Sequence, residues 1–322
     1  MVETPNVIAF SSWYRRTIET NELVLAGMFP PSYKHSWAPR LEIAKHWRTI
    51  GVGSSEFDRS WMLLDEAKCP LAEQKQNDPE NQIKLSKKHE EFMKKIEEKT
   101  NSSIKTIDDV YHIYDTLFIE KEYFGDAFEE PKWVSELGND TMKKMKEIVN
   151  LSFNQHENDL SFLRLRSGVF LNHIFEITKN VTNQTLDISP MVHTFSSHDT
   201  TIATIIQSLG LYEKPPSYGS GIIIEIRKSK LDKYVIRLLY VDVVDHNNFK
   251  ELNISKSSIF ANYCSGVTCE YEKFFDSLYH KKLLIKLQDI EKECSLPVNN
   301  EKKKFLFYKK NFFLQRKDDT KR

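Results

Sequence analysis

The chain has 322 residues, of which 40 % are hydrophobic and 29 % are charged, the composition of an ordinary globular protein. Its 46 basic and 46 acidic side chains give a formal net charge of zero, which argues against a dedicated nucleic-acid-binding protein. No apolar run is long enough for a transmembrane helix, and the first residues lack the pattern of a secretory signal peptide.

The first predicted elements are a strand followed by a helix. Residues 7–11 (VIAFS) have the composition of a short buried strand. Residues 14–29 carry apolar side chains at helical spacing, and Pro30 and Pro31 end that helix.

Residues 70–155 have a helical pattern throughout. We expect a charged amphipathic helix over 78–99, with Asp78 and Pro79 at its start, and further helices over 104–120 and 139–153. The apolar side chains expected on one side of the first helix are Ile83, Phe92 and Ile96.

Beyond residue 155 the pattern changes to helices mixed with strands. A helix is predicted over 158–179, where Gly168 indicates close packing against a neighbour and His173 is interpreted as a core or boundary residue. The remaining predicted elements are a strand at 191–197, a helix closed by Gly210, and a hairpin of strands at 220–227 and 233–243. This mixture predicts an α/β fold.

The sequence predicts a core interrupted by an insert. Residues 1–65 and 156–300 are assigned to the core and residues 66–155 to a helical cap. The tail, 301–322, has nine basic and three acidic residues interleaved with four phenylalanines. We expect this tail to be disordered, and the alternative is a membrane-surface or anion-binding segment.

Cysteines and glycosylation motifs favour an exported protein. The four cysteines (Cys69, Cys264, Cys269 and Cys294) allow three disulfide connectivities, and their spacing does not indicate a zinc site. Six N-x-S/T motifs occur, at Asn101, Asn139, Asn150, Asn180, Asn183 and Asn253. Export conflicts with the lack of a signal peptide, so we expect the natural chain to begin upstream of Met1.

The dipeptide His198–Asp199 lies where a predicted strand ends and a predicted helix begins. In open α/β sheets, ligands bind at the carboxyl ends of strands, and the first turn of a helix offers N–H groups to a phosphate. A histidine there can donate to a phosphoryl oxygen, and an adjacent carboxylic acid can protonate a leaving alcohol. The alternative is that Asp199 only caps the helix.

The segment 195–226 (FSSHDTTIATIIQSLGLYEKPPSYGSGIIIEI) resembles the second signature of the histidine acid phosphatases. Other segments resemble that family in the same order: RRTIETNELVLAGMFPP (15–31), KCPLAEQ (68–74), VYHIYDTLFIEKEY (110–123), LRLRSGVFLNHIFEI (163–177), YVIRLLYVDV and CSGVTCEYEKFF (264–275). The resemblance covers most of residues 7–295. It implies a phosphoglycerate-mutase-like core of three layers with a helical cap.

The resemblance also implies an activity and residue roles. It implies hydrolysis of small phosphate monoesters at acidic pH through a phosphohistidine, without a metal or cofactor. The expected location is secreted or lysosomal, and a homodimer is a possible assembly. His198 would contact the phosphate and Asp199 would donate the proton to the leaving group. The implied disulfides are Cys264–Cys269 and Cys69–Cys294.

The part of the family pattern that carries the nucleophile is missing. That family places its nucleophilic histidine in an Arg-His-Gly motif on the first central strand, and no Arg-His dipeptide occurs in this sequence. A third phosphate-binding arginine aligns with Phe10. We therefore expect the first central strand to be missing and the chain to be inactive as written. Two explanations stay open, an incomplete sequence of a normal phosphatase and a secreted, glycosylated, non-catalytic relative.

Overall fold

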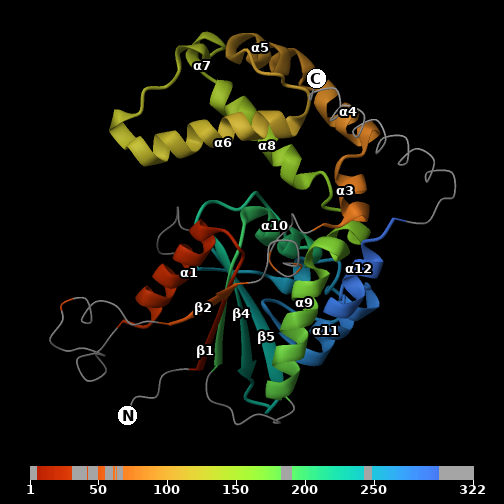
Figure 1. The fold of residues 1–322 in the computed structure, drawn as a ribbon. Coiled ribbons are helices and arrows are strands. Elements are labelled where there is room, and N and C mark those ends of the chain that lie inside the picture. Colours follow the sequence, from red (N-terminus) through yellow and green to blue (C-terminus); the bar gives the residue numbers. More distant parts are fainter. Residues whose placement is uncertain are drawn as a thin grey trace, which may run out of the picture.

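Two β-sheets with helices on either side form the centre of the molecule (Figure 1). The structure is a computed structural model, and it describes residues 6–30, 42, 50–54, 61, 63, 68–182, 191–242 and 249–296.

The first sheet is parallel and has the strand order β2-β1-β3. Its middle strand β1 (Asn6–Ser11) lies between β2 (Val52–Ser54) and β3 (Met191–Ser196). Ser11 of β1 pairs with Ser196 of β3, so the carboxyl ends of both strands lie at the same edge of the sheet. This parallel pairing brings together segments that are far apart in the sequence.

The second sheet is antiparallel, and the hairpin predicted from the sequence is confirmed. It contains β4 (Gly221–Lys228), β5 (Tyr234–Val241), β6 (Phe249–Glu251) and β7 (Thr268–Glu270). Among the described residues, β3 pairs only with β1, β4 pairs only with β5, and no ladder joins the two sheets.

Helices cover both sheets and share one hydrophobic core with them. α1 (Arg15–Met28) packs against the first sheet, α11 (Tyr271–His280) packs against β5, and α9 (Leu160–Thr182) packs against α10 (Asp199–Ser208). Burial of apolar surface in this core is the main stabilising contribution. The core includes Phe170, Leu171, Ile206, Leu209, Ile236, Leu238, Phe260, Phe274 and Leu278.

Gly168 of α9 is in close contact with a neighbouring segment, which confirms its predicted role. A Cβ atom at this position would lie 2.6 Å from the carbonyl oxygen of Leu283. The Gly168 carbonyl accepts a hydrogen bond from the backbone N–H of Ile285, at 3.1 Å. The other residue that the sequence singled out on this helix, His173, packs edge-on against Phe195, with the ring centroids 5.8 Å apart.

The helical block between residues 70 and 155 has a hydrophobic core of its own. It contains α3 (Pro70–Gln76), α4 (Pro79–Lys87), α5 (Glu90–Thr100), α6 (Ile107–Phe124), η3 (Gly125–Ala127), α7 (Lys132–Glu136) and α8 (Thr141–Asn154). Thr106 and Asp109 form a capping box at the start of α6. α5 to α8 lie above the sheets in Figure 1. The buried residues of this core are Met93, Ile96, Ile104, Ile107, Val110, Leu117, Val134, Met145 and Ile148.

One expectation for this block is wrong, because residues 78–99 do not form a single helix. The chain leaves helical geometry at His89, which has φ −115° and ψ 6°, so α4 ends before α5 begins. The two helices on either side of the break differ in how much of their surface is buried. α5 buries Met93 and Ile96, whereas α4 has no buried residue and Ile83 is 66 % exposed.

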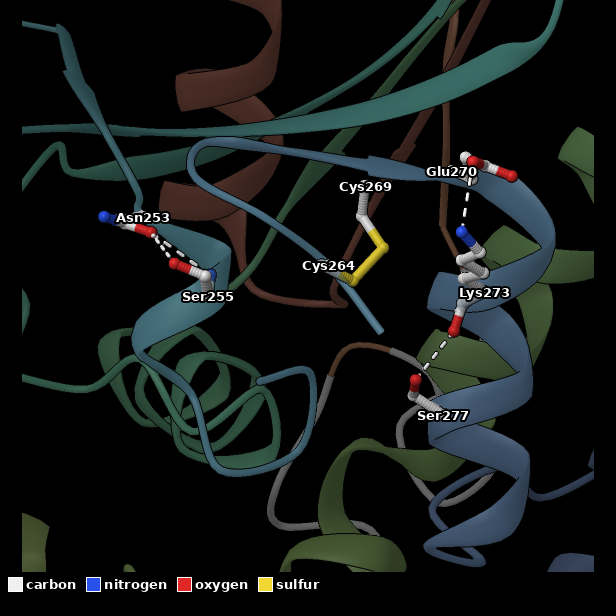
Figure 2. The surroundings of a disulfide bond; sticks show 7 residues. All are labelled: Asn253, Ser255, Cys264, Cys269, Glu270, Lys273 and Ser277. Atoms are coloured by element: carbon white, nitrogen blue, oxygen red, sulfur yellow. Dashed lines mark hydrogen bonds and ion pairs between the residues drawn. A yellow bond between two sulfur atoms is a disulfide. The ribbon is translucent and has the colours of Figure 1, made fainter. Parts of the chain in front are cut away.

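Two disulfides connect distant and neighbouring parts of the chain, with the pairing that the family resemblance implies. Cys69–Cys294 joins the start of α3 to the end of α12 (Ile290–Glu293), inside a second cluster of buried apolar residues. Figure 2 shows Cys264–Cys269 beside the start of α11, where Lys273 pairs with Glu270 at 3.1 Å.

Several sequence expectations concern the surface. Asn101 and Asn139 are exposed, whereas Asn253 is half-buried and its Oδ1 accepts a hydrogen bond from Ser255 Oγ at 2.7 Å. Asn183 and the tail 301–322 lie outside the described residues. Within the described residues, no helix combines the length and apolar character needed to cross a membrane.

Candidate functional site

His198 and Asp199 lie at the junction of β3 and α10, as the sequence predicted. His198 occupies the N-cap position, with extended backbone, and Asp199 is the first residue of the helix. The alternative that Asp199 is the N-cap is therefore wrong. Its Oδ1 accepts a hydrogen bond from the N–H of Thr200 at 2.8 Å.

The loop after β1 lies directly beside this junction. Because β1 and β3 are parallel and end together, the backbone N–H of Ser12 can donate to the carbonyl of Ser196, at 2.9 Å. The next residues, Trp13 and Tyr14, lead into α1, so the first turn of α1 faces the first turn of α10 across the sheet edge.

The imidazole of His198 contacts two side chains of this loop and helix. Its Nε2 lies 3.1 Å from Ser12 Oγ, and its Nδ1 lies 3.3 Å from Nη2 of Arg16. An arginine guanidinium can only donate, so Nδ1 must accept and the proton of a neutral His198 must sit on Nε2. His198 therefore donates to Ser12 in this arrangement.

Ser12 is held in place by a buried network. Its Oγ lies 2.7 Å from Thr17 Oγ1, and Thr17 Oγ1 in turn donates to the carbonyl of Tyr14 at 2.7 Å. Ser12 is fully buried and Thr17 is 4 % exposed. The hydroxyl proton of Ser12 thus points toward Thr17, so this serine is not activated by His198 as a base.

Aromatic contacts hold the same group from the side. The Tyr14 ring meets the His198 ring edge-on, with centroids 5.1 Å apart, and the guanidinium carbon of Arg16 lies 4.2 Å from the Tyr14 centroid. Tyr14 therefore contacts both polar side chains. Tyr14 also lines an open cavity of about 580 Å³ together with Trp13, Arg15, Ile18, Glu19 and Glu22.

The helical block between residues 70 and 155 contacts Asp199 through α6. Tyr111 donates a hydrogen bond from its hydroxyl to Asp199 Oδ2 at 3.3 Å. Burial, together with the negative charge of Asp199, raises the pKa of Tyr111 far above its ordinary value, so the phenol stays protonated and remains a donor. One carboxylate oxygen of Asp199 thus receives a hydrogen bond from the cap and the other receives one from its own helix.

Two further phenols lie within electrostatic range of Asp199. Burial, followed by the charges of Glu157 and Asp199, raises the pKa of Tyr212. Burial, followed by Asp115 and Asp199, raises the pKa of Tyr218, and the positive charge of Arg16 opposes that rise. The surroundings of Asp199 therefore contain neutral hydroxyl groups in addition to the Arg16–His198 pair.

Phe10 stands at the end of β1, where the family resemblance implies an arginine. Its side chain packs against the main hydrophobic core and makes close contact with Gly53, where an added Cβ would lie 3.3 Å from Phe10 Cδ2. The cation that contacts His198 is Arg16 instead, which the sequence interpretation did not assign to the site. A sequence signal for it existed only through the resemblance, because Arg16 lies a few residues after Phe10, the position that aligns with a phosphate-binding arginine of the family.

Known acid phosphatases are similar to this chain over more than two thirds of its length. The chain is 28 % identical over 245 residues to the human lysosomal acid phosphatase, covering 71 % of this chain and 53 % of that protein. It is 26 % identical over 243 residues to the honeybee (Apis mellifera) venom acid phosphatase Acph-1, covering 74 % of this chain and 60 % of that protein. The chain thus spans little more than half the length of these relatives.

The comparison with protein families covers most of the chain. The family model described as histidine phosphatase superfamily (branch 2) matches residues 3–241, a range that includes β1, the cap helices, the His198–Asp199 junction and the β4–β5 hairpin. The chain therefore belongs to the histidine phosphatase superfamily, branch 2, and shares its α/β fold.

Proposed function

We propose that Arg16, His198 and Asp199 form the phosphate-binding and acid-donating half of an acid phosphatase site. The observation that carries this proposal is the contact between Arg16 and His198, the residue that directly precedes Asp199 at the start of α10. The relatives, a lysosomal and a venom acid phosphatase, support phosphate monoesters as the ligand class.

The chemistry of these groups suits a phosphate ester. Arg16 is exposed and can offer further N–H groups to phosphate oxygens in a bidentate geometry. His198, in its doubly protonated form, would donate to the phosphate from Nδ1, while its Nε2–H stays directed at Ser12. The N-terminal turn of α10 adds backbone donors and the positive end of the helix dipole. Asp199, in its protonated form, would deliver a proton to the leaving oxygen.

We further propose that the 322-residue chain by itself binds phosphate esters without turning them over. Covalent phosphoryl transfer needs a nucleophile, and the Arg-His-Gly segment that the family resemblance implies does not occur in the sequence. Ser12 is not suited to replace that nucleophile. If Nε2 of His198 were to accept the Ser12 proton, Nδ1 would have to carry a hydrogen, but Nδ1 accepts a hydrogen bond from Arg16.

Titration with inorganic phosphate tests the binding proposal. Isothermal titration calorimetry at about pH 5.5, in the range where acid phosphatases of this chemistry work, should detect binding to the full chain. Arg16→Met should weaken it by about tenfold or more, because one charge-assisted pair is lost. Arg15→Met is the matched control, since the Arg15 side chain is 90 % exposed and pairs with Glu19. Equal affinity of both variants would contradict the proposal.

A phosphatase assay tests the second part. We expect no hydrolysis of p-nitrophenyl phosphate above the buffer rate. Turnover that disappears in Asp199→Ala would overturn the prediction of an inactive chain and would leave the binding proposal intact.

We also propose that the protein is exported and glycosylated. Two disulfides and six N-x-S/T motifs support this proposal, since disulfides persist in oxidising compartments. Expression behind a heterologous secretion signal, followed by treatment with an N-glycosidase, should lower the apparent mass. The exposed Asn101 and Asn139 are the first positions to check by peptide mass spectrometry.

A further inference from the structure

The end of α6 and the segment that follows it form a surface that is both apolar and acidic. We call residues 119–130 the acidic tip; they comprise the end of α6, η3 and the residues before α7. Ile119 is 46 %, Tyr123 82 % and Phe124 54 % exposed. Ile119 precedes Tyr123 by about one helical turn, and the rings of Tyr123 and Phe124 meet edge-on with centroids 5.0 Å apart. Large apolar side chains gathered on an exposed surface mark an interaction site.

The acidic tip carries an excess of negative charge that the described residues do not neutralise. Its charged residues are Glu120, Lys121, Glu122, Asp126, Glu129 and Glu130. All six are exposed, and none of them forms an ion pair with another residue that the structure describes. Elsewhere on the helical block, by contrast, Glu90, Glu91, Glu136 and Asp140 each pair with a lysine at 2.6 to 3.0 Å. Five carboxylates and one ammonium group leave the acidic tip with a net charge of −4, which favours a cationic partner.

The tail, residues 301–322, has the complementary charge and also carries aromatic side chains. Its nine basic and three acidic residues give a net charge of +6, and four phenylalanines are interleaved with them. Because the whole sequence has equal numbers of basic and acidic residues, the rest of the chain carries an excess of six acidic residues. The acidic tip holds four of that excess within a short stretch of sequence.

The tail is long enough to reach the acidic tip. The last described residue before it is Leu296, which closely follows the Cys69–Cys294 disulfide at the start of α3. In Figure 1, the end of α6 lies on the side of the helical block away from α3. Residues 297–322 can span up to about 85 Å when extended. The whole of α6, with 18 residues, is only about 27 Å long.

We propose that the tail binds to the acidic tip of the same chain. Lysine and arginine side chains of the tail would pair with the carboxylates, and its phenylalanines would cover the rings of Tyr123 and Phe124. Each exposed ion pair contributes little by itself, so the contact depends on several pairs and on the apolar surface that they surround. Tethering favours the contact further, because a linked segment is held at a high effective concentration. This inference does not depend on the proposed function.

Spectra of ¹³C-methyl-labelled isoleucines in the full chain test the proposal. Ile119 reports on the acidic tip, and Ile83 is the matched control, because it is exposed on α4 outside the acidic tip. The tail variant Lys302→Glu/Lys303→Glu/Lys304→Glu should shift the methyl signal of Ile119 and leave that of Ile83 in place. Salt at about 1 M should shift the Ile119 signal in the same direction, because it screens exposed ion pairs. An unchanged Ile119 signal in the tail variant would overturn the proposal.

Charge reversal in the acidic tip tests the contact from the other side. Trypsin cleaves after the basic residues of the tail, and mass spectrometry of the released peptides measures the rate. Glu122→Lys/Glu129→Lys/Glu130→Lys should speed this cleavage by at least about fivefold. The matched control is Glu272→Lys/Asp276→Lys on α11, since both carboxylates are exposed and neither pairs with a residue in the described part of the chain. Equal acceleration in the control would contradict the assignment to the acidic tip.

Protein concentration separates binding within one chain from binding between two copies. The effective concentration of a tethered segment does not depend on the total protein, so the rate constant of tail cleavage should stay the same over about a hundredfold range of protein concentration. Slower cleavage at higher concentration would overturn the same-chain contact in favour of one between copies. Protection of the tail that appears only when anionic lipid vesicles are added would overturn it in favour of a membrane-surface segment.

Discussion

Nη2 of Arg16 lies 3.3 Å from Nδ1 of His198, across 182 residues of sequence. This contact requires the Nε2–H tautomer of a neutral His198, because the guanidinium has no acceptor. We predict that ¹⁵N-labelled histidine spectra at neutral pH report a proton on Nε2 and none on Nδ1 of His198. Arg16→Met should allow both tautomers, whereas Arg15→Met should leave the spectrum unchanged. A proton on Nδ1 in the unaltered chain would refute the assignment.

The contact also illustrates what sequence could and could not predict here. The position of His198 and Asp199 at a strand–helix junction is a local property, and the hydrophobic pattern around residues 191–209 was sufficient to locate it. The partner Arg16 depends on the parallel pairing of β1 with β3, which no local pattern specifies. The same applies to Tyr111, because the docking of the cap decides which residue of α6 meets Asp199.

The break at His89 was missed for a different reason. Charged residues on both sides of it have high helix propensity, so the intrinsic preference of 78–99 is continuous. What separates α4 from α5 is burial, because α5 buries Met93 and Ile96 in the core of the helical block, whereas α4 packs only the partly buried Leu85 against it. Tertiary packing of this kind overrides a continuous local preference.

A second prediction concerns the hydrogen bond between Tyr111 and Asp199. Tyr111→Phe should lower the free energy of unfolding by about 1 kcal/mol, at the lower end for a bond to a charged acceptor because the distance is 3.3 Å. In a double-mutant cycle with Asp199→Asn, denaturation by urea should give a coupling energy of at least about 0.5 kcal/mol. Tyr123→Phe, at an 82 % exposed position, should change stability by less than about 0.5 kcal/mol. Strict additivity of the two variants would show that the bond contributes nothing.

A third prediction is a pH dependence that comes from His156, between α8 and α9. His156 is 8 % exposed and stacks on Phe162, with centroids 4.1 Å apart. Burial lowers the pKa of His156 below its ordinary value, and the positive charges of Lys75 and Arg166 lower it further. The negative charges of Asp159 and Asp108 oppose this decrease. The folded protein thus takes up this proton less readily than the unfolded chain. The resulting penalty is absent well above the ordinary pKa of about 6.5 and grows as the pH falls below it.

Urea denaturation at about pH 7 and about pH 5 measures this penalty. His156→Phe keeps a ring against Phe162 and removes the titration, so it should lose less stability on acidification than the unaltered chain does. His89, His173 and His193 also have lowered pKa values, mainly through burial, so a part of the pH dependence should remain. An unchanged slope in His156→Phe would contradict the prediction.

A fourth prediction uses two glycines that lie within helices. Gly168→Ala should destabilise the protein by about 1 to 3 kcal/mol, because the new methyl group would meet the Leu283 carbonyl oxygen at 2.6 Å, a backbone atom. Gly27→Ala in α1 meets nothing within 4 Å and should stabilise the helix by up to about 1 kcal/mol. Thermal unfolding of the two variants should therefore shift in opposite directions. A rise in the unfolding temperature of both variants would show that the segment after α11 moves to accommodate the methyl group added at Gly168.

The two disulfides provide the fifth prediction, since they close loops of very different length. Cys69 and Cys294 are separated by 225 residues, whereas Cys264 and Cys269 are separated by five. In the chain-entropy description, the long loop restrains the unfolded chain by about 5 kcal/mol and the short one by about 2 kcal/mol. Replacing each pair by alanines and measuring urea denaturation should give the larger loss for Cys69 and Cys294. A larger loss of stability for the Cys264–Cys269 pair would contradict this description. It would mean that this bridge acts mainly by holding the folded contacts around β7 and α11, and not by restraining the unfolded chain.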